Sequence, residues 1–269
     1  MKNNQLQGYV MEAAIEASRL EEQARQSNYS LEEELGKLHF SAGEVVMDAG
    51  CGTGLLSRYL VDRFSVGHID ALDYSELRLQ QAKNLLNPEK HQGIQFHRQD
   101  LSKLDPQFHG KYDTVICRFV VQHVENASVV IRELVKALKP GGRLIITESD
   151  GVFVNLYSPH EVLNKYMDEF LQKIPFDLHV GRKVPSLMKT LGLNEIQWEA
   201  TLLSCQGKAL QEEIENTEKR FAAATEMLAK LFGQARSEEF RDLYLQEMKK
   251  TENTLVFTRF VCVGKNVKA

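Results

Sequence analysis

The chain has 269 residues, of which 43% are hydrophobic and 26% charged, a composition typical of an ordinary globular protein. This length allows one large domain or two small ones. The net charge of −4 lacks the broad basic character of most nucleic-acid-binding proteins, although a local basic patch is compatible with it.

The cysteines and the N-terminal residues indicate the compartment. Cys51, Cys117, Cys205 and Cys262 lie far apart without a CxxC pair, so we expect neither a metal site nor a disulfide framework. The first residues contain no apolar core of a signal peptide, and no run of about 18 apolar residues follows. We therefore expect a cytoplasmic protein that does not bind a membrane.

Two short helices are expected before the first strand. Small and apolar residues recur at the spacing of one helix face: Tyr9, Ala13, Ala17, Leu20 and Ala24. Ser30 and Glu33 form an S-x-x-E capping box, which predicts that a second helix begins there. Residues 1–40 are therefore predicted to form an N-terminal helical cover.

Strands and helices then alternate over about a hundred residues. The apolar patterns predict strands at 45–49, 68–73, 94–98, 113–118 and 143–148, and helices at 54–64, 75–86 and 127–138. Short apolar strands alternating with amphipathic helices are typical of a parallel sheet covered on both faces. The expected fold is therefore α/β and doubly wound.

The pattern is looser beyond residue 148. Ser158 as N-cap, Pro159 and Glu161 predict a helix that ends near residue 173, and another helix is expected at 181–191. Strands at 195–203 and 254–263 enclose a long helical stretch. We therefore expect a mostly parallel seven-stranded sheet. Its predicted parts are an α/β core at 41–204, a helical insertion at 205–252 that serves as a lid or substrate region, and a final strand at 253–269.

The stretch VVMDAGCGTGLLS places three glycines between the first strand and its helix. In open α/β sheets ligands bind beyond the carboxyl ends of the strands, and glycine lets a ligand approach the backbone closely. The dinucleotide pattern G-x-G-x-x-G fails because Leu55 stands at its third glycine, and no lysine completes a phosphate loop. The pattern that fits is D-x-G-x-G-x-G, headed by Asp48.

This stretch resembles motif I of the class I S-adenosylmethionine-dependent methyltransferases. The resemblance implies that Asp48, Gly50, Cys51 and Gly52 bind the cofactor. Asp73 ends the second strand about 20 residues later, where a carboxylate can accept hydrogen bonds from both ribose hydroxyls. The same acid would suit NAD, so Asp73 alone does not discriminate between the two cofactors.

Further matches follow in the order of the family. Asp100 ends the third strand, where the resemblance implies a carboxylate facing the adenine amino group, which donates hydrogen bonds. Tyr74 and Leu101 would then supply apolar surface against the purine. Arg118 follows the fourth strand, where the family lines the pocket near the methionine part.

Two further residues are left with two interpretations each. Arg19 is either a charge on the solvent side of its helix or a residue whose planar guanidinium binds the cofactor carboxylate. His123 is the candidate general base by residue type, since an imidazole titrates near neutral pH, and it is also a candidate for simple packing at the start of a helix.

The resemblance implies a methyltransferase that uses S-adenosyl-L-methionine as cosubstrate and moves its methyl group by in-line displacement to a small molecule. The similar members include those of ubiquinone and menaquinone biosynthesis. The alternative is a protein that binds this cofactor without methyl transfer. A nucleic-acid or protein methyltransferase is disfavoured. Base-amino methylases carry an Asn/Asp-Pro-Pro-aromatic motif after the fourth strand, and Cys117, Arg118, Phe119 and Val120 stand here instead.

Overall fold

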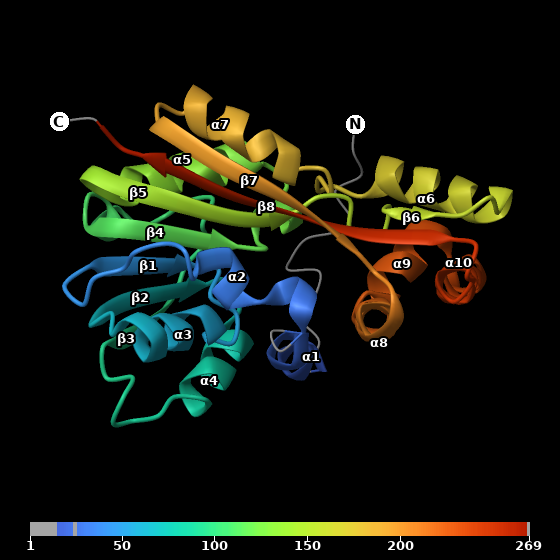
Figure 1. Ribbon diagram of the computed structural model, residues 1–269, viewed down its shortest axis with the longest axis horizontal. Helices are drawn as coiled ribbons and strands as arrows, with labels where there is room; N and C mark the ends of the chain where they lie inside the picture. Colours follow the sequence, from blue (N-terminus) through green and yellow to red (C-terminus); the bar gives the residue numbers. More distant parts are fainter. Residues whose placement is uncertain (1–14, 24–25, 268–269) are drawn as a thin grey trace.

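A computed structural model describes residues 15–23 and 26–267 (Figure 1). The structure thus describes only part of the first expected helix. Tyr9, Ala13 and Ala24 lie outside the described residues, and only the backbone of Ala17 is described. The part that is described, α1 (Ile15–Gln23), lies between the sheet and the C-terminal helices.

Within the described residues, one mixed sheet of eight strands forms the centre of the molecule. The strands are β1 (Val45–Ala49), β2 (His68–Asp73), β3 (Ile94–Arg98), β4 (Tyr112–Arg118), β5 (Leu138–Ser149), β6 (Leu156–Tyr157), β7 (Asn194–Ser204) and β8 (Thr254–Lys265). Their order is β3-β2-β1-β4-β5-β8-β6, with β7 also paired to β8. The first five strands are parallel, whereas β8 is antiparallel to β5. The doubly wound α/β fold is thereby confirmed.

Helices cover both faces of the sheet because its strands are apolar on both sides. In β1, Val46 and Met47 are both fully buried, yet they point to opposite faces and join different apolar clusters. On one face lie α2 (Leu31–Leu35), α3 (Leu55–Phe64) and α4 (Glu76–Asn84). On the other face lie α5 (Ala127–Ala137) and α7 (Val184–Thr190).

Three details differ from the sequence-based expectation. The sheet has an eighth strand, the two-residue β6, which is too short to show a pattern. Strand β5 begins at Leu138, before the expected start at residue 143, because Leu138 already pairs with Tyr112. The helix α6 (Glu161–Lys173) is capped by His160, whose ring accepts the N–H of Leu163, and not by Ser158.

The predicted second helix begins where the capping box placed it. The hydroxyl of Ser30 accepts the N–H of Glu33 at 3.3 Å at the start of α2. The reciprocal bond of the box is replaced, since the Glu33 carboxylate pairs with Arg259 of β8 at 3.4 Å. This ion pair ties the N-terminal segment to the last strand of the sheet.

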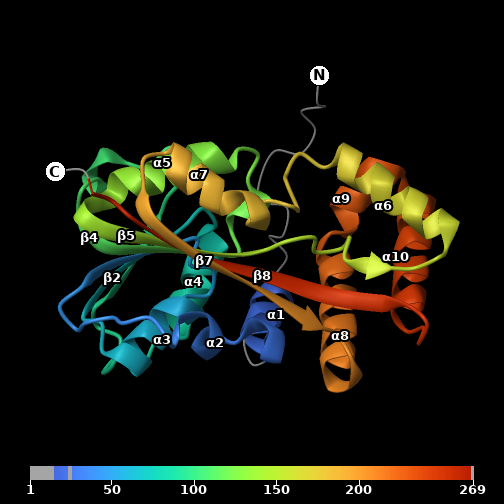
Figure 2. The same cartoon turned by 45° about the horizontal axis from the view of Figure 1, so that its top comes forward.

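The C-terminal helices form a further apolar cluster beside the sheet. They are α8 (Gly207–Ala223), α9 (Thr225–Phe232) and α10 (Gln234–Met248), and α6 packs in the same cluster. Figure 2 shows the long strands β7 and β8 running from the sheet towards these helices. The role of the helical insertion at 205–252 as a lid or substrate region stays a prediction. Across the described ranges, none of the helices is long and apolar enough to cross a membrane.

Candidate functional site

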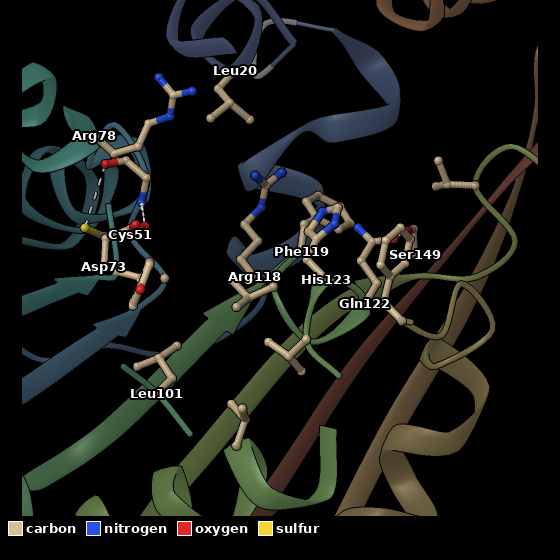
Figure 3. Close-up of a pocket in the computed structure, with 18 of the residues that line it drawn as sticks. Leu20, Cys51, Asp73, Arg78, Leu101, Arg118, Phe119, Gln122, His123 and Ser149 are labelled. Carbon is tan, nitrogen blue, oxygen red and sulfur yellow. Dashed lines mark hydrogen bonds between the residues drawn. The ribbon is translucent and has the colours of Figure 1, made fainter. Parts of the chain in front are cut away.

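A cavity of about 580 Å³ opens at the carboxyl ends of the parallel strands. It is lined by every residue that the sequence singled out for the site: Arg19, Asp48, Gly50, Cys51, Gly52, Asp73, Tyr74, Asp100, Leu101, Arg118 and His123. In Figure 3, Cys51 and Asp73 lie on one side of Arg118, and Gln122, His123 and Ser149 lie on the other. The cavity therefore has two halves, with the end of β4 between them.

The glycine-rich loop after β1 forms one wall of the first half. Gly50 has a φ of +80°, and a Cβ there would lie 2.4 Å from Cγ2 of Val120. Gly54, at φ +71°, is the N-cap of α3. Both positions require glycine for conformation, and the close approach to Val120 leaves no space for a side chain at Gly50. The loop thus packs closely against Val120, and its residues from Gly50 to Thr53 line the cavity.

Asp73 holds this loop in place. Its Oδ2 accepts the N–H of Gly52 at 2.8 Å, and its Oδ1 accepts the N–H of Ser75 at 2.9 Å. Burial raises the pKa of Asp73, and the two backbone bonds oppose that shift. Each carboxylate oxygen has a second lone pair, so Asp73 can also accept hydrogen bonds from a ligand in the cavity.

Asp48 lies deeper, directly below the loop. Its Oδ2 accepts the hydroxyl proton of Ser57 at 2.6 Å, and its side chain is almost fully buried. Burial raises the pKa of Asp48 to about 6, in part offset by this bond. Asp48 therefore supports the loop by bonding the first turn of α3.

Asp100, Tyr74 and Leu101 surround the outer end of the first half. Oδ1 of Asp100 accepts both the N–H and the hydroxyl of Ser102, at 2.8 and 2.7 Å. Among the described residues, Oδ2 of Asp100 has no hydrogen-bond donor. Tyr74 is half exposed beside the cavity, whereas Leu101 is buried. One carboxylate oxygen is thus left to accept a hydrogen bond at a part of the cavity that Tyr74 and Leu101 also line.

Helix α1 packs over the glycine-rich loop that follows β1. Glu21 accepts hydrogen bonds from the hydroxyl of Thr53, at 2.5 Å, and from the guanidinium of Arg58, at 2.7 Å. Arg19 and Leu20 of the same helix line the cavity. Arg19 is therefore a buried cavity residue and not the solvent-side charge that was one of its two interpretations.

Arg118 lines the cavity, and its charged end is bound to the protein. The guanidinium donates to both oxygens of Glu34 at 2.6 and 2.8 Å and to the backbone oxygen of Tyr29 at 3.0 Å. The Glu34 side chain is fully buried. This pair fastens α2 to the end of β4, so Arg118 shapes the site by holding the N-terminal segment. A direct contact of Arg118 with a cofactor stays a prediction.

His123 lies in a short 3-10 helix, Val121–His123, at the start of the second half. Burial and the positive charges of Arg19 and Arg220 lower the pKa of His123 to about 4. The imidazole is therefore neutral at pH 7. It is available to accept a proton, but it is a weak base for a hydroxyl or an ammonium group.

The second half contains residues that the sequence did not single out. They are Tyr29, Phe119, Gln122, Ser149, Phe153, Phe170, Phe176, Met227 and Arg220, among others. Phe119 and Phe153 have positive φ values of 54° and 68°, which are unusual for aromatic residues and occur at functional sites. No local motif marks these residues, since they come from at least five separate segments and only the fold brings them together.

Glu148 is a fully buried acid next to this half. Its carboxyl accepts the N–H groups of Ser149 at 2.9 Å and of Gln122 at 3.1 Å. Burial raises the pKa of Glu148 from 4.5 to about 8, because the low-dielectric interior disfavours the charged form. The carboxyl group is therefore mostly protonated at neutral pH.

This raised pKa predicts a pH-dependent stability. Between pH 4.5 and 8 the folded protein keeps a proton that the unfolded chain releases, so the Glu148 contribution is full below pH 4.5 and is lost as the pH rises through 8. The loss amounts to at most about 1.4 kcal/mol per pH unit. We expect the free energy of unfolding, measured with urea, to decline less between pH 6.5 and pH 8 for Glu148→Gln than for the unmodified protein. Equal declines would contradict the assignment.

The comparisons with known proteins agree with this geometry. A family of methyltransferase domains matches residues 47–146, from β1 into β5. The ubiquinone biosynthesis O-methyltransferase of Marinobacter nauticus is 34% identical over 108 residues. That match covers 39% of this chain and 44% of the relative, so the chain matches less than half of the length of this curated relative.

Solved structures resemble the chain over a longer region. Phosphoethanolamine N-methyltransferase 2 of Haemonchus contortus, in complex with S-adenosyl-L-methionine, has a TM-score of 0.58 at 18% identity, over 88% of this chain and 53% of that one. The [4+2]-cyclase SpnF has a TM-score of 0.58 at 17% identity, over 88% and 78% of the two chains. These likenesses concern the fold. Over residues 47–146 the chain matches a family of methyltransferase domains, and its ordered motifs of β1 to β5 resemble those of the class I S-adenosylmethionine-dependent methyltransferases.

Proposed function

We propose that the protein is an S-adenosylmethionine-dependent methyltransferase that acts on a small molecule. One observation carries this proposal. The cavity has a glycine loop and two acids, Asp73 and Asp100, in its first half, and it continues past the end of β4 into a second half. A site for the cofactor alone would have no need of the second half.

The residues of the first half fit this cofactor. Asp73 would accept the ribose hydroxyls, and the unbonded oxygen of Asp100 would accept the adenine amino group between Tyr74 and Leu101. The space over Gly52, where a Cβ would meet only Cδ1 of Leu20 at 3.7 Å, suits the close approach of an amino-acid chain to the backbone. Arg19 of α1 would pair with the carboxylate at that end.

When bound, the cofactor would supply a methyl group that its sulfonium activates for transfer. The protein would align an acceptor with that methyl group and exclude water, and positioning of this kind can account for about 7–11 kcal/mol of a barrier. Helix α1 closes the cavity over the glycine loop, while Arg118 fixes α2 through Glu34. His123 is a weak base here, so we propose that alignment rather than proton removal is the main contribution of the protein.

A binding protein, or an enzyme with another reaction, is the second candidate. The chain shares its fold with SpnF, which is named as a [4+2]-cyclase, and a fold does not determine a reaction. Nucleic acid is not a proposed partner. We also propose a cytoplasmic location, which the four free and buried cysteines support.

Release of S-adenosylhomocysteine from S-adenosylmethionine tests the proposed activity. We expect release above background with at least one member of a panel of catechols, primary amines and carboxylic acids, because the cavity has room for an acceptor. Release should stop in Asp73→Ala. Binding of S-adenosylhomocysteine without release across the panel would favour the binding protein.

A further inference from the structure

Three polar residues lie together at the second half of the cavity. Arg220 of α8 donates from Nη1 to Oε1 of Glu213 and from Nη2 to the hydroxyl of Tyr29, both at 2.5 Å. The Tyr29 hydroxyl lies 3.3 Å from Oε2 of Glu213. Tyr29 and Arg220 line the cavity, and all three residues are buried.

Arg220 keeps donors for a ligand. A guanidinium has five N–H groups. The described residues accept three hydrogen bonds from it, since Thr217 adds one at 3.5 Å to those of Glu213 and Tyr29. Two N–H groups are therefore left on a cation that is only 6% exposed and lines a cavity. Buried donors of this kind usually have a partner.

Besides Gln122, His123 and Ser149, this half has a large apolar and mostly aromatic wall. Its walls include Phe153, Phe170, Phe176, Leu178 and Met227. The ring of Phe153 meets that of Phe170 edge to face, with the centroids 6.1 Å apart. Such walls suit a flat or elongated apolar body. The polar residues Tyr29 and Arg220 thus stand at the edge of an apolar pocket.

We infer that the methyl acceptor is an apolar, ring-containing molecule with one oxyanion, and that Arg220 binds this oxyanion. The inference rests on the proposed function and adds the class of acceptor to it. A guanidinium binds an oxyanion with charge-assisted hydrogen bonds, which are about twice as strong as neutral ones. The partial neutralisation of Arg220 by Glu213 favours a single negative charge over a phosphate dianion.

The test uses 2-naphthoate and its neutral isostere 2-naphthamide, titrated into protein saturated with S-adenosylhomocysteine. We expect the naphthoate to bind at least about tenfold more tightly than the amide. Glu213→Gln keeps the Arg220 charge and should keep this preference. The double variant Glu213→Gln, Arg220→Gln removes both charges of the pair, which avoids an unpaired buried acid, and it should lose the preference.

A neighbouring ion pair supplies the control. Lys219 of α8 pairs with Glu22 of α1 outside the cavity, so Glu22→Gln, Lys219→Gln should keep the preference for the acid. Equal affinity for both probes in the unmodified protein would overturn the inference. So would a preference that survives in the double variant, or no saturable naphthoate binding by protein with S-adenosylhomocysteine bound. Failure of S-adenosylhomocysteine itself to bind would instead overturn the proposed function.

Discussion

Asp73→Ala is expected to weaken the binding of S-adenosylhomocysteine by a hundredfold or more. The carboxylate accepts the N–H groups of Gly52 and Ser75, so its removal frees the glycine loop from the end of β2. It would also remove the proposed bonds to the ribose. Hydrogen bonds to charged groups contribute about 1.5–3 kcal/mol each, and two of them correspond to a factor of a hundred or more in affinity. Calorimetric titration measures the change.

Two variants separate this effect from a general loss of structure. Asp105→Ala removes an acid that likewise accepts a backbone N–H, from Gln107, but lies outside the cavity lining, and it should bind as the unmodified protein does. Asp73→Asn keeps the shape and one acceptor oxygen and should lose less than Asp73→Ala. Affinity within threefold of the original in a folded Asp73→Ala protein would contradict the role given to Asp73.

Arg118→Met is expected to cost about 3 kcal/mol of stability. The change leaves the fully buried carboxylate of Glu34 without the guanidinium that donates to both of its oxygens. Breaking a buried ion pair costs about 3–5 kcal/mol. The value should lie at the lower end because Arg259 remains 3.6 Å from Glu34. Urea unfolding at pH 7 measures the loss, and a change below about 1 kcal/mol would contradict it.

The double variant Glu34→Gln, Arg118→Met tests how Arg118 serves the cavity. If Arg118 acts by holding α2, removing both charges should restore at least half of the lost stability and leave the affinity for S-adenosylhomocysteine within fivefold of the original. An equal and large loss of affinity in the single and double variants would instead show that Arg118 contacts the cofactor.

The sequence was most informative where function requires particular backbone geometry. The glycines at 50, 52 and 54 all have positive φ values, and Asp73 hydrogen-bonds to the backbone of Gly52. Strands β1 to β5 alternate with helices over consecutive segments, so local apolar patterns were enough to predict the doubly wound fold.

The second half of the cavity could not be predicted in this way. More than a hundred residues lie between Tyr29 and Arg220 in the sequence, and Phe153 stands among them. Only tertiary packing brings these three residues to one cavity. Ser158 shows the same limit at a helix end. It had the pattern of an N-cap, but its hydroxyl donates to Glu247 of α10 at 2.6 Å, so His160 caps the helix instead.

The central claim is that the glycine loop, Asp73 and Asp100 form a site for S-adenosylmethionine and not for a dinucleotide. Calorimetric titration of the unmodified protein with S-adenosylmethionine, its demethylated product and NADH tests it most directly. The two sulfur compounds should each bind saturably at one site per chain, and NADH should give no saturable heat. Saturable binding of NADH, with none of either sulfur compound, would contradict the claim.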